Sequence, residues 1–235
     1  MDIQSLIQFD QELLLKMNGS NSLFWDGFMW LATNMLTWMP LVAVLLYVII
    51  KNNNIKESLL IIIFLALVVL LNDQISSGIC KPFFARFRPT QDPILMYQID
   101  IVNGYRGGMY GFTSSHAANT FGVAVFLSLL IKSYSLSFVF FIWATLNAYS
   151  RIYLGVHYPG DILFGIITGI SIGFLIYLLY NHLQRRILAQ PSYISNQYTS
   201  SGYLKSDINI VQTVFILISF YIIIGGMVMT HISFF

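Results

Sequence analysis

The sequence predicts an all-α fold, a polytopic membrane helix bundle of about six transmembrane helices with a short N-terminal interfacial helix. Of its 235 residues, 57% are hydrophobic and only 9% are charged, whereas about a quarter of the residues in a water-soluble domain are charged. The hydrophobic residues occur in runs of about 20, the length that crosses a hydrocarbon core of about 30 Å. This composition excludes disordered, collagen-like and disulfide-rich secreted proteins, and a net charge of +2 predicts no nucleic-acid partner.

Residues 1–23 form the predicted N-terminal interfacial segment. Leu6, Phe9, Leu13 and Met17 recur at helical spacing among polar residues, which predicts an amphipathic helix lying in the membrane interface. The segment is too short and too charged to span a bilayer. We therefore expect a collar of the bundle rather than a functional element.

Six hydrophobic segments follow, each about as long as a transmembrane helix. The first five belong to a membrane domain over residues 24–207, and the sixth is an additional C-terminal transmembrane helix in residues 208–235. Pro40 interrupts the first segment and predicts a kink there. The predicted spans cover residues 24–50, 57–80, 114–131, 136–153, 161–180 and 208–230.

The basic residues predict which end of the bundle faces the cytoplasm. With six spans, the N-terminus, the 81–113 loop and the 151–160 connection share one side of the membrane. Outside the candidate site described below, that side carries Lys16, Arg86 and Arg106. The opposite side carries Lys51, Lys56, Lys132, Arg185, Arg186 and Lys205. The positive-inside rule therefore places the N-terminal side outside, which in a bacterial inner membrane means facing the periplasm or the exterior.

The fifth span carries a stripe of glycines. Gly165, Gly169 and Gly173 are four residues apart, a spacing that lets a neighbouring helix approach closely. Asp161 lies four residues before Gly165 and so falls on the same helix face. The stripe predicts that this carboxylate points into the bundle.

The remaining polar residues concentrate in three short blocks, all on the predicted outer side. A cluster of ionisable groups at the ends of membrane helices is costly unless it binds or pairs with something. The blocks are Lys81 to Pro89, Thr113 to His116, and Ser150 to Asp161.

The first two blocks suit an anion. Lys81 and Arg88 are seven residues apart, which on a helix places them on one face, although two cations that extend to the interface would look the same. Thr113, Ser114 and Ser115 precede a hydrophobic helix, so one of them is expected as its N-cap. A helix N-terminus binds anions readily, but capping alone would also explain this run.

His157 and Asp161 have a spacing that suits either a nucleophile or a metal site. A carboxylate that accepts a hydrogen bond from one ring nitrogen leaves the other nitrogen free as a nucleophile or base. Two histidines and a carboxylate could also bind iron or zinc. Lys81, Arg88 and Arg151 would repel a cation and attract an oxyanion, so we expect no metal and no other cofactor.

Together the three blocks resemble the signature of the type 2 phosphatidic acid phosphatase and vanadium haloperoxidase superfamily. That signature is Lys, six residues, Arg-Pro; then Ser-x-His; then Ser-Arg, five residues, His, three residues, Asp. It covers a catalytic core over about residues 57–180. The middle block departs from the common Pro-Ser-Gly-His form, with Thr113 and Ser115 in place of proline and glycine.

The resemblance implies a role for each matching residue. His157 would be the nucleophile, Asp161 its orienting partner and His116 the acid that protonates the leaving oxygen. The phosphoryl oxygens would be bound by Lys81, Arg88, Arg151, the Ser114 hydroxyl and the Ser115 backbone. Phosphoryl transfer depends on positioning and positive donors, which these residues supply.

The resulting hypothesis is a metal-independent membrane phosphatase that acts on a lipid phosphate through a phosphohistidine intermediate. Undecaprenyl diphosphate, phosphatidylglycerol phosphate, phosphatidic acid and lipid A phosphates all stay open as substrates, as does the oligomeric state. A phosphotransferase using the same site is one alternative. A lipid transporter is a weaker one, because its polar residues would be distributed through the bilayer depth.

Overall fold

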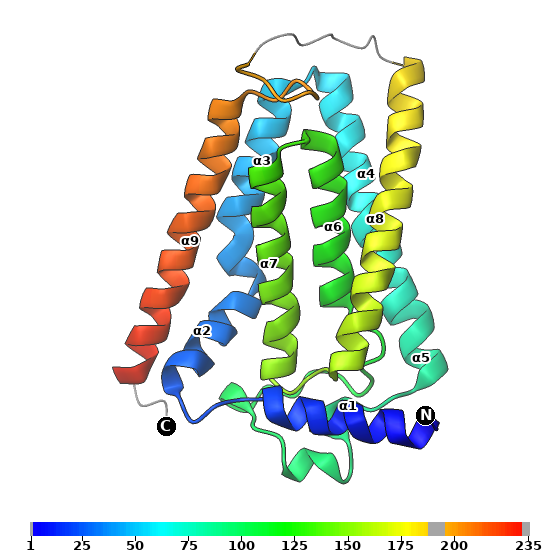
Figure 1. Cartoon of the computed structure of the whole chain (residues 1–235), viewed down its shortest axis with the longest axis vertical. Helices are drawn as coiled ribbons and strands as arrows, with labels where there is room; N and C mark the ends of the chain where they lie inside the picture. Colours follow the sequence, from blue (N-terminus) through cyan, green and yellow to red (C-terminus); the bar gives the residue numbers. More distant parts are fainter. Residues whose placement is uncertain (1, 188–195, 232–235) are drawn as a thin grey trace.

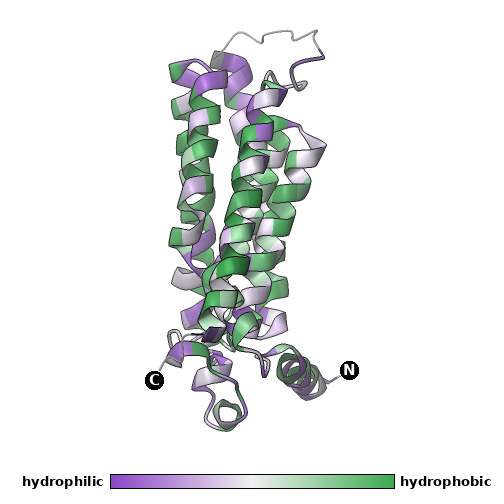
Figure 2. Ribbon diagram, turned by 90° about the vertical axis from the view of Figure 1, so that its left-hand side faces the viewer, coloured by the Kyte–Doolittle hydropathy of each residue, from purple (hydrophilic) through white to green (hydrophobic). Residues whose placement is uncertain are grey.

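The computed structural model describes residues 2–187 and 196–231, and its named elements in these ranges are all helices. Figure 1 shows an upright bundle with the short helix α1 lying across one end. Figure 2 shows hydrophobic residues along the middle of the bundle and hydrophilic residues towards both ends. The predicted all-α bundle is confirmed.

Helix α1 (Ile3–Met17) is the predicted N-terminal helix. Asp2 caps it, since its Oδ1 atom accepts a hydrogen bond of 3.2 Å from the Gln4 amide. Leu14 is fully buried against the bundle, whereas Leu6 and Phe9 are exposed. An apolar outer face on a helix that lies across the end of a membrane bundle is the pattern of an interfacial helix (Figure 1).

The first predicted span is broken into α2 (Leu23–Thr33), the 3₁₀ turn η1 (Met35–Trp38) and α3 (Met39–Asn52). The break lies at Asn34, which is extended and whose side chain accepts a hydrogen bond of 3.0 Å from the Leu36 amide. The prediction of a kink at Pro40 was wrong. Pro40 lies in the first turn of α3, where its missing N–H is not needed.

The second span is one helical run made of α4 (Ile55–Asp73), the π-helical segment η2 (Gln74–Cys80) and α5 (Lys81–Phe84). It ends at Ala85, which adopts the left-handed conformation with φ 45°. Lys81 and Arg88 therefore do not share a helix face, and that prediction was wrong. The loop beyond holds the short turns η3 (Pro89–Gln91), η4 (Leu95–Tyr97) and η5 (Val102–Gly104).

The other four helices are α6 (Ser115–Ile131), α7 (Tyr134–Tyr153), α8 (Pro159–Ile187) and α9 (Lys205–His231). Helix α6 packs against α4, α7 and α8. The glycine stripe of α8 faces α6: a methyl group at Gly165, Gly169 or Gly173 would overlap a backbone oxygen of α6 or its cap. The close approach predicted from this stripe is confirmed, and Asp161 on the same face is completely buried.

Four helical segments of the described residues are long and apolar enough to cross a membrane. They are Met35–Asn52, Ile55–Phe84, Pro159–Arg186 and Lys205–His231. Helix α6 is apolar but only 17 residues long, and α7 carries polar side chains such as Asn147 and Arg151 among its 20 residues. Both run alongside the four in Figure 1. The count of six spans is thus confirmed for four of them.

Candidate active site

The three polar blocks meet at the end of the bundle where α1 lies. Their side chains come from α5, the loop after it, the start of α6, the end of α7 and the start of α8, segments far apart in the sequence. The predicted site residues found here are Lys81, Arg88, Ser114, Ser115, His116, Arg151, His157 and Asp161.

His157 is fixed between a cation and a carboxylate. It lies in the α7–α8 connection with 2% of its surface exposed. Its Nε2 atom is 3.1 Å from Nη1 of Arg88. Its Nδ1 atom is 3.5 Å from Oδ2 of Asp161 and has no hydrogen-bond partner in the described part of the chain. Asp161 is therefore in place beside the ring, but the expected hydrogen bond between them is not formed.

The surroundings of His157 keep it neutral. Burial lowers the pKa of His157 well below its ordinary value of 6.5, and the positive charges of Arg88, Arg151 and Lys81 lower that pKa further. The backbone of Gly111 acts in the opposite direction with a smaller effect. A neutral imidazole has a lone pair that can attack an electrophile.

Three cations of the site have only neutral hydrogen-bond partners in the described ranges. Lys81 donates to two serine hydroxyls and Arg88 to two backbone oxygens, while Arg151 donates to one threonine and one tyrosine hydroxyl. Arg88 and Arg151 are buried, with 9% and 3% of their surfaces exposed. Burial lowers the pKa of Arg88, and the charge of Arg151 lowers it further. Buried cations without a carboxylate are costly, so this cluster suits an anionic ligand.

The start of α6 faces the same cluster. Ser114 is the N-cap, because its Oγ atom accepts a hydrogen bond of 3.4 Å from the Ala117 amide. This confirms the predicted capping. The backbone N–H of Ser114 donates a hydrogen bond of 3.1 Å to the Asp161 carbonyl. The Ser115 hydroxyl accepts a hydrogen bond of 2.8 Å from Lys81, and His116 is exposed. The helix end and the Lys81 ammonium group thus meet.

One hydroxyl connects Lys81 to Asp73, an exposed residue at the end of α4. Lys81 donates to Ser77 at 2.8 Å, and Ser77 donates to Asp73 at 3.2 Å. Ser77 lies in the π-helical segment, a distortion common at functional sites. Asp73 is therefore linked to Lys81 through Ser77 rather than by a direct ion pair.

Comparison with known proteins identifies the family. The model of the PAP2 superfamily matches residues 59–185. The chain belongs to the PAP2 superfamily. It is 42% identical over 79% of its length to a lipid A 4'-phosphatase of Bacteroides thetaiotaomicron, covering 83% of that protein. It is 33% identical over 91% of its length to a lipid A 4'-phosphatase of Porphyromonas gingivalis, covering 91% of it. No solved structure matches the chain.

Membership of the PAP2 superfamily confirms the resemblance drawn from the three blocks. The similarity to two phosphatases also confirms the prediction of an enzyme, a phosphatase of the hydrolase class. With its apolar helices, the chain is an integral membrane protein that acts on lipid phosphate.

Two ionic residues of this PAP2 site were missed by the sequence analysis. Arg86 was counted as a solvated cation, but its Nη1 atom lies 2.9 Å from Oδ1 of Asp161. Its Nη2 atom lies 2.7 Å from Oδ2 of Asp10, which belongs to the supposed collar α1. The only signal in the sequence was the position of Arg86 between two predicted site cations.

The loop of residues 89–111 supports the PAP2 site from outside. Tyr105 accepts a hydrogen bond of 2.9 Å from Arg151. Burial raises the pKa of Tyr105, but the neighbouring Arg151 lowers it by more, so the net direction is down. Arg106, a possible headgroup contact by sequence, instead donates to the Thr90 carbonyl at 3.1 Å. At Gly111 a methyl group would lie 3.0 Å from Asp161 Oδ2, so a larger residue would crowd the site.

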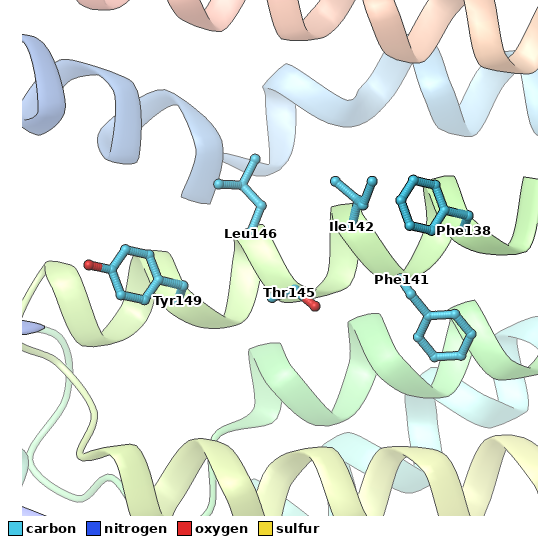
Figure 3. A pocket seen from close by; sticks show the side chains of 6 residues that line it. All are labelled: Phe138, Phe141, Ile142, Thr145, Leu146 and Tyr149. Atoms are coloured by element: carbon cyan, nitrogen blue, oxygen red, sulfur yellow. The ribbon is translucent and has the colours of Figure 1, made fainter.

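Apolar side chains of α7 line a separate groove of about 500 Å³ (Figure 3). Its lining residues are Phe138, Phe141, Ile142, Thr145, Leu146 and Tyr149. None of them carries a charge at neutral pH, so this groove lacks the cations that mark the site between α5, α6 and α8. No three His, Cys, Asp or Glu side chains within residues 2–187 and 196–231 lie close enough together to hold a metal ion.

Proposed function

We propose that this PAP2 phosphatase removes a phosphate monoester from a membrane lipid by way of a covalent phosphohistidine. The observation that carries the proposal is the cluster of Lys81, Arg88 and Arg151, three cations whose hydrogen-bond partners in the described ranges are all neutral. They surround a buried neutral histidine. A phosphoryl group would supply the missing negative charge and meet the nucleophile in the same place.

In this proposal the phosphoryl oxygens bind to the three cations, the Ser114 hydroxyl and the Ser115 backbone N–H. Preformed donors around these oxygens stabilise the charge of the transition state. The Arg88 contact with His157 Nε2 supports the arrangement, because it holds a phosphate-binding cation 3.1 Å from the nucleophilic nitrogen. A phosphate bound to Arg88 is thus presented to that nitrogen.

The reaction then has two steps. His157 Nε2 attacks phosphorus and forms the N–P bond, the ester P–O bond breaks, and His116 gives its proton to the leaving lipid oxygen. Water, deprotonated by His116, then attacks the phosphohistidine, which releases inorganic phosphate and restores His157. The exposure of His116 supports this role, since the leaving group and the water both need access to it. Neither step uses a cofactor.

The substrate class is proposed from the relatives. Two proteins named lipid A 4'-phosphatase match 79% and 91% of the chain. We therefore propose a 4'-phosphate of lipid A as the substrate, presented at the outer face of the bacterial inner membrane. The positive-inside count supports this side, because α1 and the site lie at the end of the bundle with fewer solvated basic residues.

The deciding experiment is phosphate release by the purified protein from four lipids. They are lipid A bisphosphate, undecaprenyl diphosphate, phosphatidylglycerol phosphate and phosphatidic acid. We expect the fastest release from lipid A, at the 4'-position, with no loss of activity in chelator and with inhibition by vanadate. A matched His157→Gln protein should release none.

The product balance distinguishes hydrolysis from transfer. One inorganic phosphate should appear for each dephosphorylated lipid, with or without added sugar or lipid acceptors. A deficit of free phosphate in the presence of an acceptor would contradict hydrolysis. Preference for one of the other three lipids would overturn the substrate but not the reaction.

A further inference from the structure

Arg86 joins the interfacial helix to the carboxylate beside the nucleophile. Its guanidinium group binds Asp161 Oδ1 at 2.9 Å with one nitrogen and Asp10 Oδ2 at 2.7 Å with the other. The Asp161 side chain is fully buried, whereas Arg86 and Asp10 expose 26% and 15% of theirs. The contacts run from Asp10 through Arg86 to the buried Asp161, so negative and positive charges alternate along them.

Arg86 is the cation nearest to Asp161. The other carboxylate oxygen, Oδ2, accepts a hydrogen bond of 3.1 Å from the Tyr158 amide and lies 3.5 Å from His157 Nδ1. A buried carboxylate needs a cation or several donors to stay ionised in place. Arg86 supplies that cation on one oxygen and leaves the other oxygen directed at the histidine ring.

Asp10 fixes Arg86 and the start of α8 at once. Its Oδ2 atom accepts from Arg86, and its Oδ1 atom accepts a hydrogen bond of 2.7 Å from the amide of Gly160, the residue before Asp161. The Arg86 guanidinium also lies 3.9 Å from the centroid of the Tyr158 ring, a cation–π contact. These contacts hold two residues, Tyr158 and Gly160, that lie between His157 and Asp161.

We infer that Arg86 and Asp10 are positioning residues of the reaction, with α1 acting as part of the catalytic apparatus through them. The inference rests on the proposed function, because it assumes that His157 attacks the phosphate. When Nε2 bonds to phosphorus the ring becomes cationic, and Nδ1–H must then donate to Asp161 Oδ2. Arg86, itself held by Asp10, binds Oδ1 and so keeps Oδ2 on the side of Nδ1, which means that the two residues affect the chemical step rather than phosphate binding.

The test is a set of purified full-length variants assayed for kcat and KM with the lipid that the wild type hydrolyses fastest. Arg86→Gln should lower kcat by about 10–100-fold, the loss typical of residues that orient a reactive side chain, with KM changed less than about threefold. Asp10→Ala should lower kcat by about tenfold for the same reason. Arg86→Lys keeps the charge but not the two-pronged contact, so its kcat should lie between those of wild type and Arg86→Gln.

Two controls separate positioning from a general loss of structure. Glu12→Gln removes an exposed charge from α1 and should leave kcat unchanged. In a double-mutant cycle, Asp10→Ala should cost less in the Arg86→Gln background than in the wild type, because part of its effect acts through Arg86 and only its contact with the Gly160 amide is then left to lose. A merely structural role would instead give additive losses that follow thermal stability.

The inference would be overturned by Arg86→Gln and Asp10→Ala proteins that keep wild-type kcat, or by losses confined to KM. If the wild-type protein released no phosphate from any lipid, the proposed function would fail instead. The two failures are therefore distinguishable in one experiment.

Discussion

The two ends of the bundle handle buried charge in opposite ways. At the end away from α1, Asp207 is 1% exposed, and its two oxygens bind Lys51 at 2.7 Å and Asn52 at 2.9 Å. At the α1 end, Arg88 and Arg151 are equally buried but donate only to neutral groups in the part of the chain that the structure describes. The charge of Asp207 is balanced within the protein, whereas the proposed phosphate would balance those of Arg88 and Arg151.

The difference shows how to distinguish a structural ion pair from a ligand site without reference to motifs. The end with Asp207 also has a polar hollow of about 360 Å³, lined partly by Glu57, Lys132 and Arg185. Lys132 and Arg185 are exposed, so water solvates them, and Glu57 accepts a hydrogen bond of 3.1 Å from Gln184. Cations that water reaches need no ligand, whereas buried ones do.

Replacing the nucleophile should have the largest effect on the α1 end. His157→Gln removes the attacking nitrogen, so kcat should fall by about 1,000-fold or more. Phosphate release from the lipid substrate measures this, with circular dichroism to show that the helices are retained. Residual activity within tenfold of wild type would mean that another group attacks phosphorus.

Neutralising a cation should lower activity at the α1 end of the bundle and stability at the other end. Arg88→Gln and Arg151→Gln should lower kcat/KM by about 100–1,000-fold, because each removes a donor to the transition-state charge. Lys51→Gln should leave kcat/KM unchanged but lower Tm by about 3–6 °C, because it leaves Asp207 without its cation. Steady-state kinetics and thermal unfolding in detergent measure both quantities. A loss of activity in Lys51→Gln would break the comparison.

A phosphate-like anion should stabilise the protein against unfolding by binding at the α1 end only. Phosphate or vanadate at about 100 times its Kd should stabilise the wild-type protein by about 2.7 kcal/mol. Thermal unfolding should show the same shift for Lys51→Gln and none for Arg88→Gln. An equal shift in all three proteins would place the anion somewhere other than the cationic cluster.

The last expected effect is a pH dependence of stability. Because the folded-state pKa of His157 is lowered, its contribution is complete above about pH 6.5 and is lost as the pH falls towards the folded pKa. Wild type should therefore lose up to about 1.4 kcal/mol per pH unit relative to His157→Gln below that pH. Parallel unfolding curves of the two proteins between pH 7.5 and 4.5 measure the difference. A stability difference that does not change with pH would show that the pKa of His157 is not lowered in the folded protein.

The sequence predicted the residues of the site better than their partners. Spacing and residue type were sufficient to predict an N-cap within residues 113–115, the buried Asp161 and the family. The pairing of Arg86 with Asp161 was not predictable, because it joins positions 75 residues apart and depends on how the loop returns to the bundle. Nothing local distinguishes such an arginine from a solvated one.

Helix positions were predictable from hydrophobic runs, but helix breaks were not. The first span breaks at Asn34 rather than Pro40, because an asparagine side chain can cap the next turn while a proline fits the first turn of a helix. The turn at Ala85 was missed for a related reason. Alanine favours helices, so its residue type does not predict the left-handed backbone of Ala85. The strand-like segment that follows, in which Phe87 pairs with Tyr110, accounts for this conformation through its tertiary contacts.

The glycine stripe of α8 has a consequence for how such an enzyme can change its preference. Because α6 and α8 touch backbone to backbone, and the Ser114 amide binds the Asp161 carbonyl at 3.1 Å, the second and third polar blocks form one rigid unit. The loop of residues 89–111 borders the site from outside that unit, and apart from its contacts through Tyr105, Tyr110 and Gly111 it can accept substitutions without moving the nucleophile. New lipid specificities can thus arise in the loop while the reaction itself is inherited intact.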